Sequence, residues 1–557
     1  MRNGYALSRS ILAVGACALT LVAVGQSNGS PRGNTAGNNR IAGTVVSKID
    51  GHPLDRARVL LRDSKAAAEP LSTVTSADGK FSFENVAAGK YSLVGLKGGF
   101  ITAAYDQHDQ YSTAIVAGAE FDTENLTLRL SPAAIISGRV LDEAGEPVRQ
   151  AMVTLYRNNH FQGVDQIQLV RGDQTDDLGA YEMASLTPGT YFLAVHAQPW
   201  YAVHPSVPAD HADSDGNARA GTNLDRSLDV AYPMTYYQNA TEADGATPIQ
   251  IRGGERLSID LSLSPVPSLR LIFHLHLPES QKGRFLVPQL EQPVFDAVTP
   301  LEAMPRQISP DVVELTGVPA GRYNVRIQAD STITQLNGVD FNRDGEEVDT
   351  SAAEPVGTVK FSATVLGEAA IPPGLAVGLT RERTALRTMD RLNPKGEAEI
   401  PRVSAGTYDV WVQGAARQYV IVSISADGAQ VQGHSVTVPA SASATVALTL
   451  AVGVDVQGVA KKAGKPFAEA MIVLVPKEVA GNRDLFRRDQ SDLDGTFSLR
   501  GVVPGSYTLI AIENGWDLDW SRPEIIAPYR KRGQPVEISG KASGTVQVKE
   551  VIEVQPK

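Results

Sequence analysis

The 557-residue sequence has one cysteine, little helical patterning and no long basic run. Cys17 lies inside an N-terminal apolar stretch, so a chain that has lost this stretch would contain no thiol nucleophile and no disulfide. Its stability must then come from buried apolar side chains and sheet pairing. Acidic and basic residues are mixed along the chain, and the net charge is −11, so we expect no nucleic-acid partner.

The common catalytic motifs are also missing. The nine histidines form no His-Glu-x-x-His zinc motif, and there is no Gly-x-x-x-x-Gly-Lys-Ser/Thr phosphate loop. Gly-x-Ser-x-Gly occurs only at residues 25–29, where no strand precedes it and no helix follows it. These absences predict a chain that is not an enzyme.

The N-terminus has the pattern of an export signal. Arginines precede an apolar run from Ile11 to Val24, and small residues follow it. We predict a signal peptide at residues 1–25 and a flexible leader, rich in Gly, Asn and Ser, at 26–40. The residues before Cys17 faintly resemble a lipoprotein cleavage box, but the apolar run continues beyond it, which favours an ordinary position in the signal core. The run is short for a bilayer and no later stretch is long and apolar enough, so we expect no transmembrane segment in the mature chain.

A pattern of turn, strand, turn and strand is repeated along the chain. In its first copy Asp78-Gly79 is a tight-turn dipeptide, and alternating apolar residues from Phe81 to Val86 predict a strand with one buried face. Gly89-Lys90-Tyr91 then begins a second alternating strand. The Gly-x-Tyr half occurs five times, and an internal repeat of this kind decides the architecture. Its tyrosines are Tyr91, Tyr191, Tyr323, Tyr408 and Tyr507.

We interpret these five residues as structural tyrosine corners. In such a corner the phenol hydroxyl bonds to backbone a few residues upstream while the ring fills the end of the sandwich core. A catalytic tyrosine is the alternative, but no other reactive residue recurs beside them.

The repeat predicts an all-β chain of tandem Ig-like or transthyretin-like antiparallel β-sandwich modules. Gly (50) and Pro (33) are abundant, and short alternating runs lie between turn signals. The second module carries a long insertion, and the third and fourth are degenerate because they keep mainly the Gly-x-Tyr half. The predicted boundaries are 41–131, 132–265, 266–353, 354–450 and 451–557.

Modules one, two and five resemble the carboxypeptidase regulatory-like domain, a transthyretin-like sandwich grouped with carbohydrate-binding-like folds. In module two the resemblance rests on Gly138-Arg139-Val140, Gly145-Glu146-Pro147, Ala151-Met152-Val153-Thr154-Leu155, Gly179-Ala180-Tyr181 and Pro188-Gly189-Thr190-Tyr191-Phe192-Leu193. The resemblance implies an accessory, binding or spacer module, because in carboxypeptidases this domain carries none of the zinc ligands. Chained copies behind a signal peptide resemble large secreted or envelope proteins of bacteria.

An acidic loop is the best candidate metal site. Asp340, Asn342 and Asp344 place oxygen ligands at every second residue before Gly345, a spacing that can wrap Ca²⁺. The twelfth position of an EF-hand-type loop would need Glu and is Ser351, so the alternative is a solvated acidic hairpin. No other cofactor is expected.

Aromatic residues gather around the insertion of module two. Flat aromatic faces beside amides and carboxylates suit sugar rings, so these residues form a candidate carbohydrate-binding site. The alternative is that the rings pin the insertion to its sandwich. The residues are Trp200, Tyr201, Tyr232, Tyr236 and Tyr237.

Together these patterns predict a non-catalytic binding or spacer protein that is secreted, periplasmic or in the outer cell envelope of a bacterium. A glycan is the favoured ligand, with an envelope protein as another possible partner. The alternatives are an accessory part of an extracellular hydrolase or peptidase system and a purely structural or adhesion rod.

Overall fold

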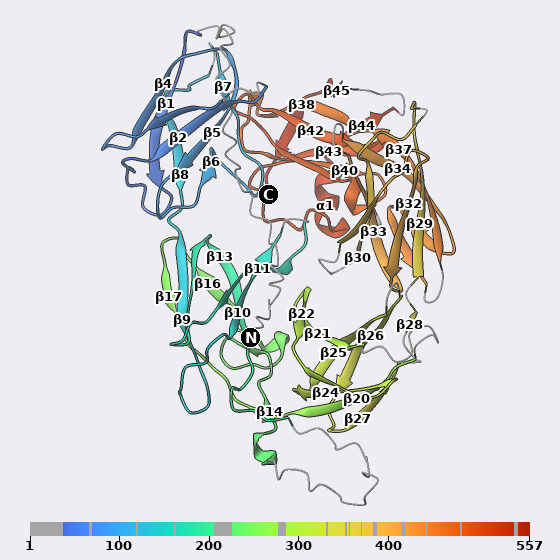
Figure 1. The fold of residues 1–557 in the computed structure, drawn as a ribbon. Helices are drawn as coiled ribbons and strands as arrows, with labels where there is room; N and C mark the ends of the chain where they lie inside the picture. The colour runs from blue at the N-terminus through green and yellow to red at the C-terminus, as the bar shows by residue number, and fades with distance from the viewer. Residues whose placement is uncertain are drawn as a thin grey trace, which may run out of the picture.

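The computed structural model describes residues 37–557, except residues 66–68, 119–120, 161–162, 205–224, 277–285, 330–331, 351–353, 356, 369, 382–386, 415–417, 440–442, 480–481 and 540–543. The predicted signal peptide, Cys17 and most of the leader lie outside these residues. The prediction of an all-β fold is confirmed, since strands build every layer and the described part contains one α-helix (Figure 1). No helix among the described residues combines the length and the apolar character needed to cross a membrane.

Module one packs a sheet of order β4-β1-β8 against a sheet of order β3-β2-β5-β6, with β7 also on β5. Its strands are β1 (Asn39–Ser47), β2 (Arg58–Asp63), β3 (Leu71–Val74), β4 (Lys80–Val86), β5 (Gly89–Leu96), β6 (Ala103–Ala104), β7 (Ile115–Ala117) and β8 (Leu126–Leu130).

Module two repeats this plan with sheets β12-β9-β17 and β11-β10-β13-β15, to which β18 and β16 are added. Its strands are β9 (Ala134–Leu141), β10 (Met152–Asn159), β11 (Gln166–Gln174), β12 (Ala180–Leu186), β13 (Gly189–His196), β14 (Val230–Ala231), β15 (Thr235–Tyr236), β16 (Ile249–Ile251), β17 (Arg256–Ser258) and β18 (Leu261–Ser262). The segment that leads out of the module, β19 (Val266–Pro267), pairs back with β14.

Module three packs β23-β24-β20-β27 against β22-β21-β25-β26-β28. Its strands are β20 (Leu269–His274), β21 (Gln289–Val294), β22 (Ala297–Leu301), β23 (Met304–Ser309), β24 (Val312–Val318), β25 (Gly321–Ala329), β26 (Thr332–Phe341), β27 (Glu346–Asp349) and β28 (Glu354–Pro355). Because β28 pairs with β26, this module extends slightly past residue 353, where the sequence pattern placed its end.

Module four packs β32-β29-β37-β34 against β31-β30-β33-β36-β35. Its strands are β29 (Gly357–Val365), β30 (Ala376–Arg381), β31 (Arg387–Arg391), β32 (Glu397–Val403), β33 (Gly406–Gln413), β34 (Tyr419–Asp427), β35 (Gln430–Gln432), β36 (Ser435–Val438) and β37 (Ala444–Val452). Gly453 alone separates β37 from the first strand of module five.

In module five, β46 pairs with both β38 and β43 and so joins the two sheets at one edge. The helix α1 starts with Pro523, which has no N–H to lose at a helix start. The elements are β38 (Val454–Lys462), β39 (Lys465–Pro466), β40 (Met471–Pro476), β41 (Arg487–Gln490), β42 (Thr496–Val502), β43 (Gly505–Ile512), α1 (Pro523–Arg530), β44 (Gln534–Ile538), β45 (Thr545–Gln547) and β46 (Ile552–Gln555).

Each module encloses its own apolar core, and the five cores are separate clusters of buried residues. The sheets are not purely antiparallel, because the first strand of every module pairs in parallel with a late strand of the same module. Antiparallel neighbours can be joined by a tight turn, whereas a parallel pair needs a long connection, and here the rest of the module supplies it.

The same β-bulge occurs in all five modules. In the strand before the Gly-x-Tyr strand, one extra residue opposes the first strand. That residue has left-handed backbone with φ between 56° and 76°, and it lies four residues before the turn glycine. The five bulge residues are Asn85, Ser185, Gly317, Arg402 and Gly501.

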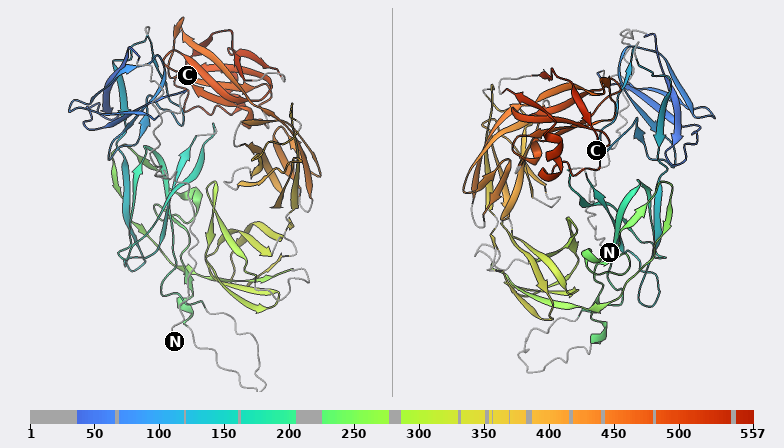
Figure 2. Two further views of the ribbon diagram at one scale, coloured as in Figure 1. Left: turned by 45° about the horizontal axis from the view of Figure 1, so that its top comes forward. Right: turned by 180° about the vertical axis from the view of Figure 1, so that it is seen from behind.

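The five modules form a closed circle rather than a rod (Figures 1 and 2). Each module contacts the next one in sequence, and module five also contacts modules one and two. We call these contacts of module five with modules one and two the closure. An aromatic cluster around Phe295 joins modules two and three, and a small apolar cluster around Val420 and Val503 joins modules four and five.

Candidate functional site

The five tyrosines of the repeat occupy equivalent places. Each phenol donates a hydrogen bond to the backbone carbonyl four residues upstream, over 2.7–3.0 Å, and each side chain is buried. The acceptors are the carbonyls of Ala87, Thr187, Pro319, Ser404 and Val503. The ring closes the end of each core and the hydroxyl holds the turn before its strand, which is a structural task.

Two of the five predicted sugar-binding aromatics bond to one carboxylate, and a third packs on one of them. Trp200 is 83% exposed and meets Tyr201 edge to face, with the ring centroids 5.9 Å apart. Tyr201 donates to Glu143 Oε1, and Tyr232 donates to Glu143 Oε2 over 3.0 Å. Burial works to raise the pKa of Glu143, but these hydrogen bonds hold it below its ordinary value. We call Trp200, Tyr201 and Glu143 the aromatic patch.

The other two predicted aromatics lie elsewhere. Tyr236 is only 1% exposed and packs edge to face on Phe295 of module three, with the centroids 5.6 Å apart. Tyr237 is half-buried against the core of module two, and Tyr232 is 4% exposed. The structure therefore does not gather the five rings into one surface strip, and only Trp200 and Tyr201 offer ring surface to a ligand.

The carboxylates of the acidic loop point to separate arginines. Arg270 binds Asp344 through its main-chain N–H at 3.0 Å and its guanidinium at 2.7 and 2.9 Å. Asp340 pairs with Arg322 at 3.1 Å. The main-chain N–H of Asn342 faces Glu346. The guanidinium of Arg270 lowers the pKa of Asp344, so this carboxylate is already neutralised, and the loop directs no shared set of oxygens at an ion.

A Ser, His and Asp group occurs where module two meets module three. His204 Nδ1 lies 3.0 Å from Asp229 Oδ1 and 3.4 Å from Ser268 Oγ, and Ser268 also donates to Asp229. A catalytic triad needs the acid on one imidazole nitrogen and the nucleophile on the other. Here both partners share Nδ1, so this group holds the two modules together and lacks the geometry for acyl transfer.

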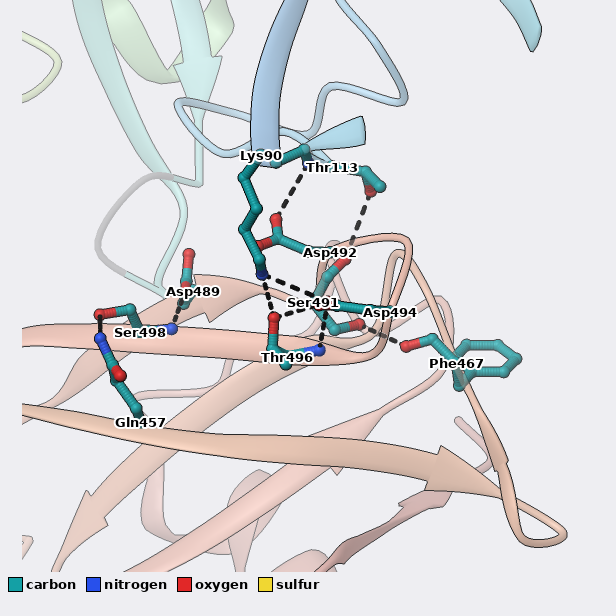
Figure 3. Close-up of polar contacts among 11 residues, drawn as sticks. Lys90, Thr113, Gln457, Phe467, Asp489, Ser491, Asp492, Asp494, Thr496 and Ser498 are labelled. Carbon is teal, nitrogen blue, oxygen red and sulfur yellow. Dashed lines mark hydrogen bonds and ion pairs between the residues drawn. The ribbon is translucent and has the colours of Figure 1, made fainter. Parts of the chain in front are cut away.

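The closure begins at Lys90 of module one (Figure 3). Its ammonium group reaches Asp492 Oδ2 at 2.6 Å and Asp494 Oδ1 at 3.2 Å, and it also contacts Thr496 Oγ1. The backbone adds two bonds, from Ala114 N to Asp492 Oδ1 over 2.9 Å and from Leu493 N to the Ala114 carbonyl over 3.1 Å. The three charged side chains are 19–28% exposed, so solvent screens this pair less than a surface salt bridge.

Beside Lys90, the guanidinium of Arg488 is enclosed by aromatic rings from both modules. It lies 4.6 Å from the ring centroid of Trp520 and 5.4 Å from that of Tyr111, and it pairs with Asp109 at 3.3 Å. His108 of module one stacks on Trp516 of module five, with the ring planes 6° apart. Cation–π contacts strengthen when the cation is desolvated, and the Arg488 side chain is only 4% exposed.

Two acids of module five have raised pKa values. Burial raises the pKa of Asp489 to about 6, against a hydrogen bond of 2.6 Å from the Ser498 N–H. Burial, and after it the Asp106 carboxyl of module one, raises the pKa of Glu469 to about 7. Perturbed acids mark functional sites or structural ion networks. Glu469 faces Asp106 of module one, whereas Asp489 lies within module five against the Ser498 N–H.

The second half of the closure joins module two to module five. The His160 imidazole lies between Asp165 of its own hairpin and the Leu518 carbonyl, at 2.9 and 2.7 Å. Ser521 Oγ donates to the Gly163 carbonyl over 3.0 Å. A side chain at Gly163 would collide with the indole of Trp520, so the close approach depends on glycine there.

No motif in the sequence indicated the closure. Trp516 of module five stacks on His108 of module one, so this ring covers more than the end of its own sandwich. The sequence contained only a weak indication that module five contacts another module. Two tryptophans and an arginine near the C-terminus exceed what one sandwich end requires, but nothing in the chain identifies residues 90–114 as their partners.

Comparison with known proteins supports the interpretation of modules one and two as repeated copies of one domain. The family model of the carboxypeptidase regulatory-like domain matches residues 40–130 and 135–217, so the chain carries this domain in two tandem copies, which are modules one and two. Among curated proteins, no match was found.

Several solved structures show distant likeness. The Bacillus anthracis TIE protein is 10% identical, with 93% of this chain and 73% of that chain covered and a TM-score of 0.17. The minor pilin GBS52 of Streptococcus agalactiae is 12% identical over 41% of this chain and 97% of its own, with a TM-score of 0.20. The full-length major pilin RrgB of Streptococcus pneumoniae is 10% identical over 94% and 100%, with a TM-score of 0.17. These TM-scores are too low to bear on module arrangement or function.

Proposed function

We propose that this chain is an exported, non-catalytic protein of the bacterial envelope whose five sandwich modules form a closed scaffold that presents a carbohydrate-binding patch. The proposal has two parts. The scaffold part rests on the separate cores and the closure, and the ligand part rests on the aromatic patch of module two.

The observation that carries the ligand part is the exposure of Trp200. Its indole leaves most of its surface in water while the edge of Tyr201 supports one side. Glu143 accepts from the Tyr201 phenol, whose ring contacts the indole, and from the Tyr232 phenol. Sugars offer apolar ring faces that stack on an indole and hydroxyl groups that donate to a carboxylate, so the two groups complement a pyranose ring.

The scaffold part is supported by contacts between modules that are not neighbours in the sequence. A rod needs contacts only between sequence neighbours, whereas here module five binds modules one and two through ion pairs, backbone bonds and stacked rings. These contacts fix the position of the aromatic patch relative to the other modules. The Ser268 group lacks triad geometry, which favours a structural role for it.

A second candidate is an accessory part of an extracellular hydrolase or peptidase system. The match of modules one and two to a carboxypeptidase regulatory-like domain favours it. This candidate predicts that a partner enzyme, rather than a glycan, is retained on the immobilised chain. Neither candidate depends on calcium; in the acidic loop Arg270 pairs with Asp344 and Arg322 pairs with Asp340.

A glycan array with the full mature chain tests the ligand part. We expect binding to a subset of glycans, and Trp200→Ala should weaken it about tenfold or more through loss of ring stacking. Met389→Ala is the matched control, because Met389 is 62% exposed in module four and far from the patch in sequence. Silence across the array, or equal binding by Trp200→Ala, would overturn carbohydrate binding at this patch and leave the scaffold part standing.

A further inference from the structure

Titratable side chains lie at several of the contacts between modules. His204 is one where module two meets module three, and His434 of module four faces Asp484 of module five. Each half of the closure also contains a titratable side chain that faces the other module. These side chains are His160 of module two and Glu469 of module five.

Both nitrogens of His160 face acceptors. Nδ1 lies 2.9 Å from Asp165 Oδ1, and Nε2 lies 2.7 Å from the Leu518 carbonyl and 3.4 Å from Asp519 Oδ1. A carbonyl and an ionised carboxylate can only accept, so each nitrogen must carry a proton to bond its partner. The closed arrangement therefore requires the doubly protonated imidazolium, since a neutral ring would leave one nitrogen facing an acceptor without a proton.

The charges around His160 come from both modules. Arg522 pairs with Asp519 at 3.1 Å, and Lys557 pairs with Asp517. The group His160, Asp165 and Asp519 could also hold a metal ion by proximity alone. However, Asp165 and Asp519 lie on opposite nitrogens of the ring, so one ion cannot take the place of both protons.

The other half of the closure sets two carboxyl groups against each other. The Asp106 carboxyl of module one acts on Glu469 across the interface, and two ionised carboxylates there would repel each other. The backbone keeps them together, because the Asp106 carbonyl accepts from Gln490 Nε2 over 2.6 Å and the Glu469 N–H donates to the Ser491 carbonyl over 3.0 Å. The nearby ionisable groups are Arg129, 3.7 Å from Asp106, and Tyr105.

We propose that the closure is held by protons, so that module five binds modules one and two in mildly acidic solution and releases them as the solution becomes alkaline. His160 and Glu469 each need a proton in the closed form. Each side chain holds this proton less tightly when the modules separate. Loss of either proton leaves a buried, unmatched acceptor or two facing negative charges.

The sign of the linkage is the same for each group. Burial works to lower the pKa of His160, but Asp165 and the Leu518 carbonyl raise it above its ordinary value. The pKa of Glu469 is raised to about 7, first by burial and then by Asp106. Burial also raises the pKa of Asp492 despite Lys90. A group with a raised pKa stabilises the closed form at low pH and loses that contribution as the pH rises through its raised value, so the opening is centred near or above pH 7.

Small-angle X-ray scattering of the full mature chain between pH 5.5 and 9 tests the proposal. We expect the radius of gyration to increase between pH 6.5 and 8.5. Exchange of the Ala114 and Leu493 amides, corrected for intrinsic rates, should rise about tenfold for each pH unit in that window. A constant radius of gyration with unchanged protection of these amides would overturn the proposal.

Three variants make the test specific. Glu469→Gln should open at a higher pH than the natural chain, because an amide donates to Asp106 without a titrating proton while His160 still loses its own. His160→Gln, which carries no charge, should open at a lower pH than the natural chain. His52→Gln is the matched control, since His52 pairs with Asp50 inside module one on an exposed surface, and it should leave the profile unchanged. If Glu469→Gln and His160→Gln, both folded by circular dichroism, follow the natural profile, the proposal is wrong; opening by EDTA at pH 6 would instead assign the contact to a metal.

Discussion

Replacing Tyr323 with phenylalanine removes one oxygen from the core of module three. The phenol is 1% exposed and donates to the Pro319 carbonyl over 2.8 Å inside the sandwich. Burial raises the pKa of this phenol, so it stays protonated and remains a donor at any physiological pH. The variant keeps the ring and its packing, and it isolates the hydroxyl bond that the repeat has in every module.

The expected cost is about 1–3 kcal/mol, because a buried carbonyl loses its partner and water cannot replace it. For a module of this size, each 1 kcal/mol corresponds to about 4–8 °C in the midpoint of thermal unfolding. A chain of five modules does not unfold in two states, so a single midpoint would average over modules. Hydrogen exchange resolved by peptide, with faster exchange expected in β24 and β25, is the appropriate assay.

Tyr156→Phe is the matched control for this experiment. Tyr156 is also 1% exposed, but its hydroxyl lies 3.5 Å from Thr299 Oγ1, at the limit of a hydrogen bond. It should cost well under 1 kcal/mol, about the value of a weak bond. If Tyr323→Phe destabilises module three no more than Tyr156→Phe affects its surroundings, the corner hydroxyl does not hold the turn and our account of the repeat is wrong.

Two further substitutions test the closure and the buried acids. Arg488→Ala should weaken the closure by about 2–4 kcal/mol, because it removes a desolvated cation from three rings and leaves Asp109 unpaired. Small-angle scattering should show a more open chain. Arg322→Ala is the control, because Arg322 forms an exposed pair inside module three, and it should leave the scattering unchanged. Asp489→Asn should stabilise module five above pH 6 by about 3 kcal/mol, because burial raises the pKa of Asp489 from 3.8 to about 6 and penalises the ionised form above that pH. No gain, or a loss, in thermal stability at pH 8 would contradict that reasoning.

The local pattern was sufficient to predict the sandwich and its corners. Gly-x-Tyr after an alternating strand specifies a turn, a strand start and a ring at the core end, and all three lie within a few residues of one another. The phenols accordingly lie where the pattern placed them, each on the carbonyl four residues earlier. The recurring bulge could not be predicted from the sequence. Its residue is asparagine, serine or arginine in three modules, and none of these by itself indicates left-handed backbone.

Contacts between modules could not be predicted from the sequence, because the partners lie far apart along the chain. Tyr236 has the sequence context of an exposed loop residue, yet its ring is buried and packs on Phe295 of module three. Asp344 has the spacing of a calcium ligand, and its oxygens are taken by Arg270, which lies outside the loop. Lys90 and Asp492 occupy turns where charged residues are expected anyway, so neither indicates the other.

The bulge has one more consequence, for the order of the modules. A side chain on Gly317 would collide with His204, which reaches it from module two, and one on Gly501 would collide with Gln418, which reaches it from module four. The bulges of modules one, two and four carry Asn85, Ser185 and Arg402 at this position. Copies that share one fold are therefore not interchangeable units. Swapping module three or five with another would place a side chain against His204 or Gln418 of the preceding module, which would then have to move. Glycine at these two bulges therefore matches each module to the module before it.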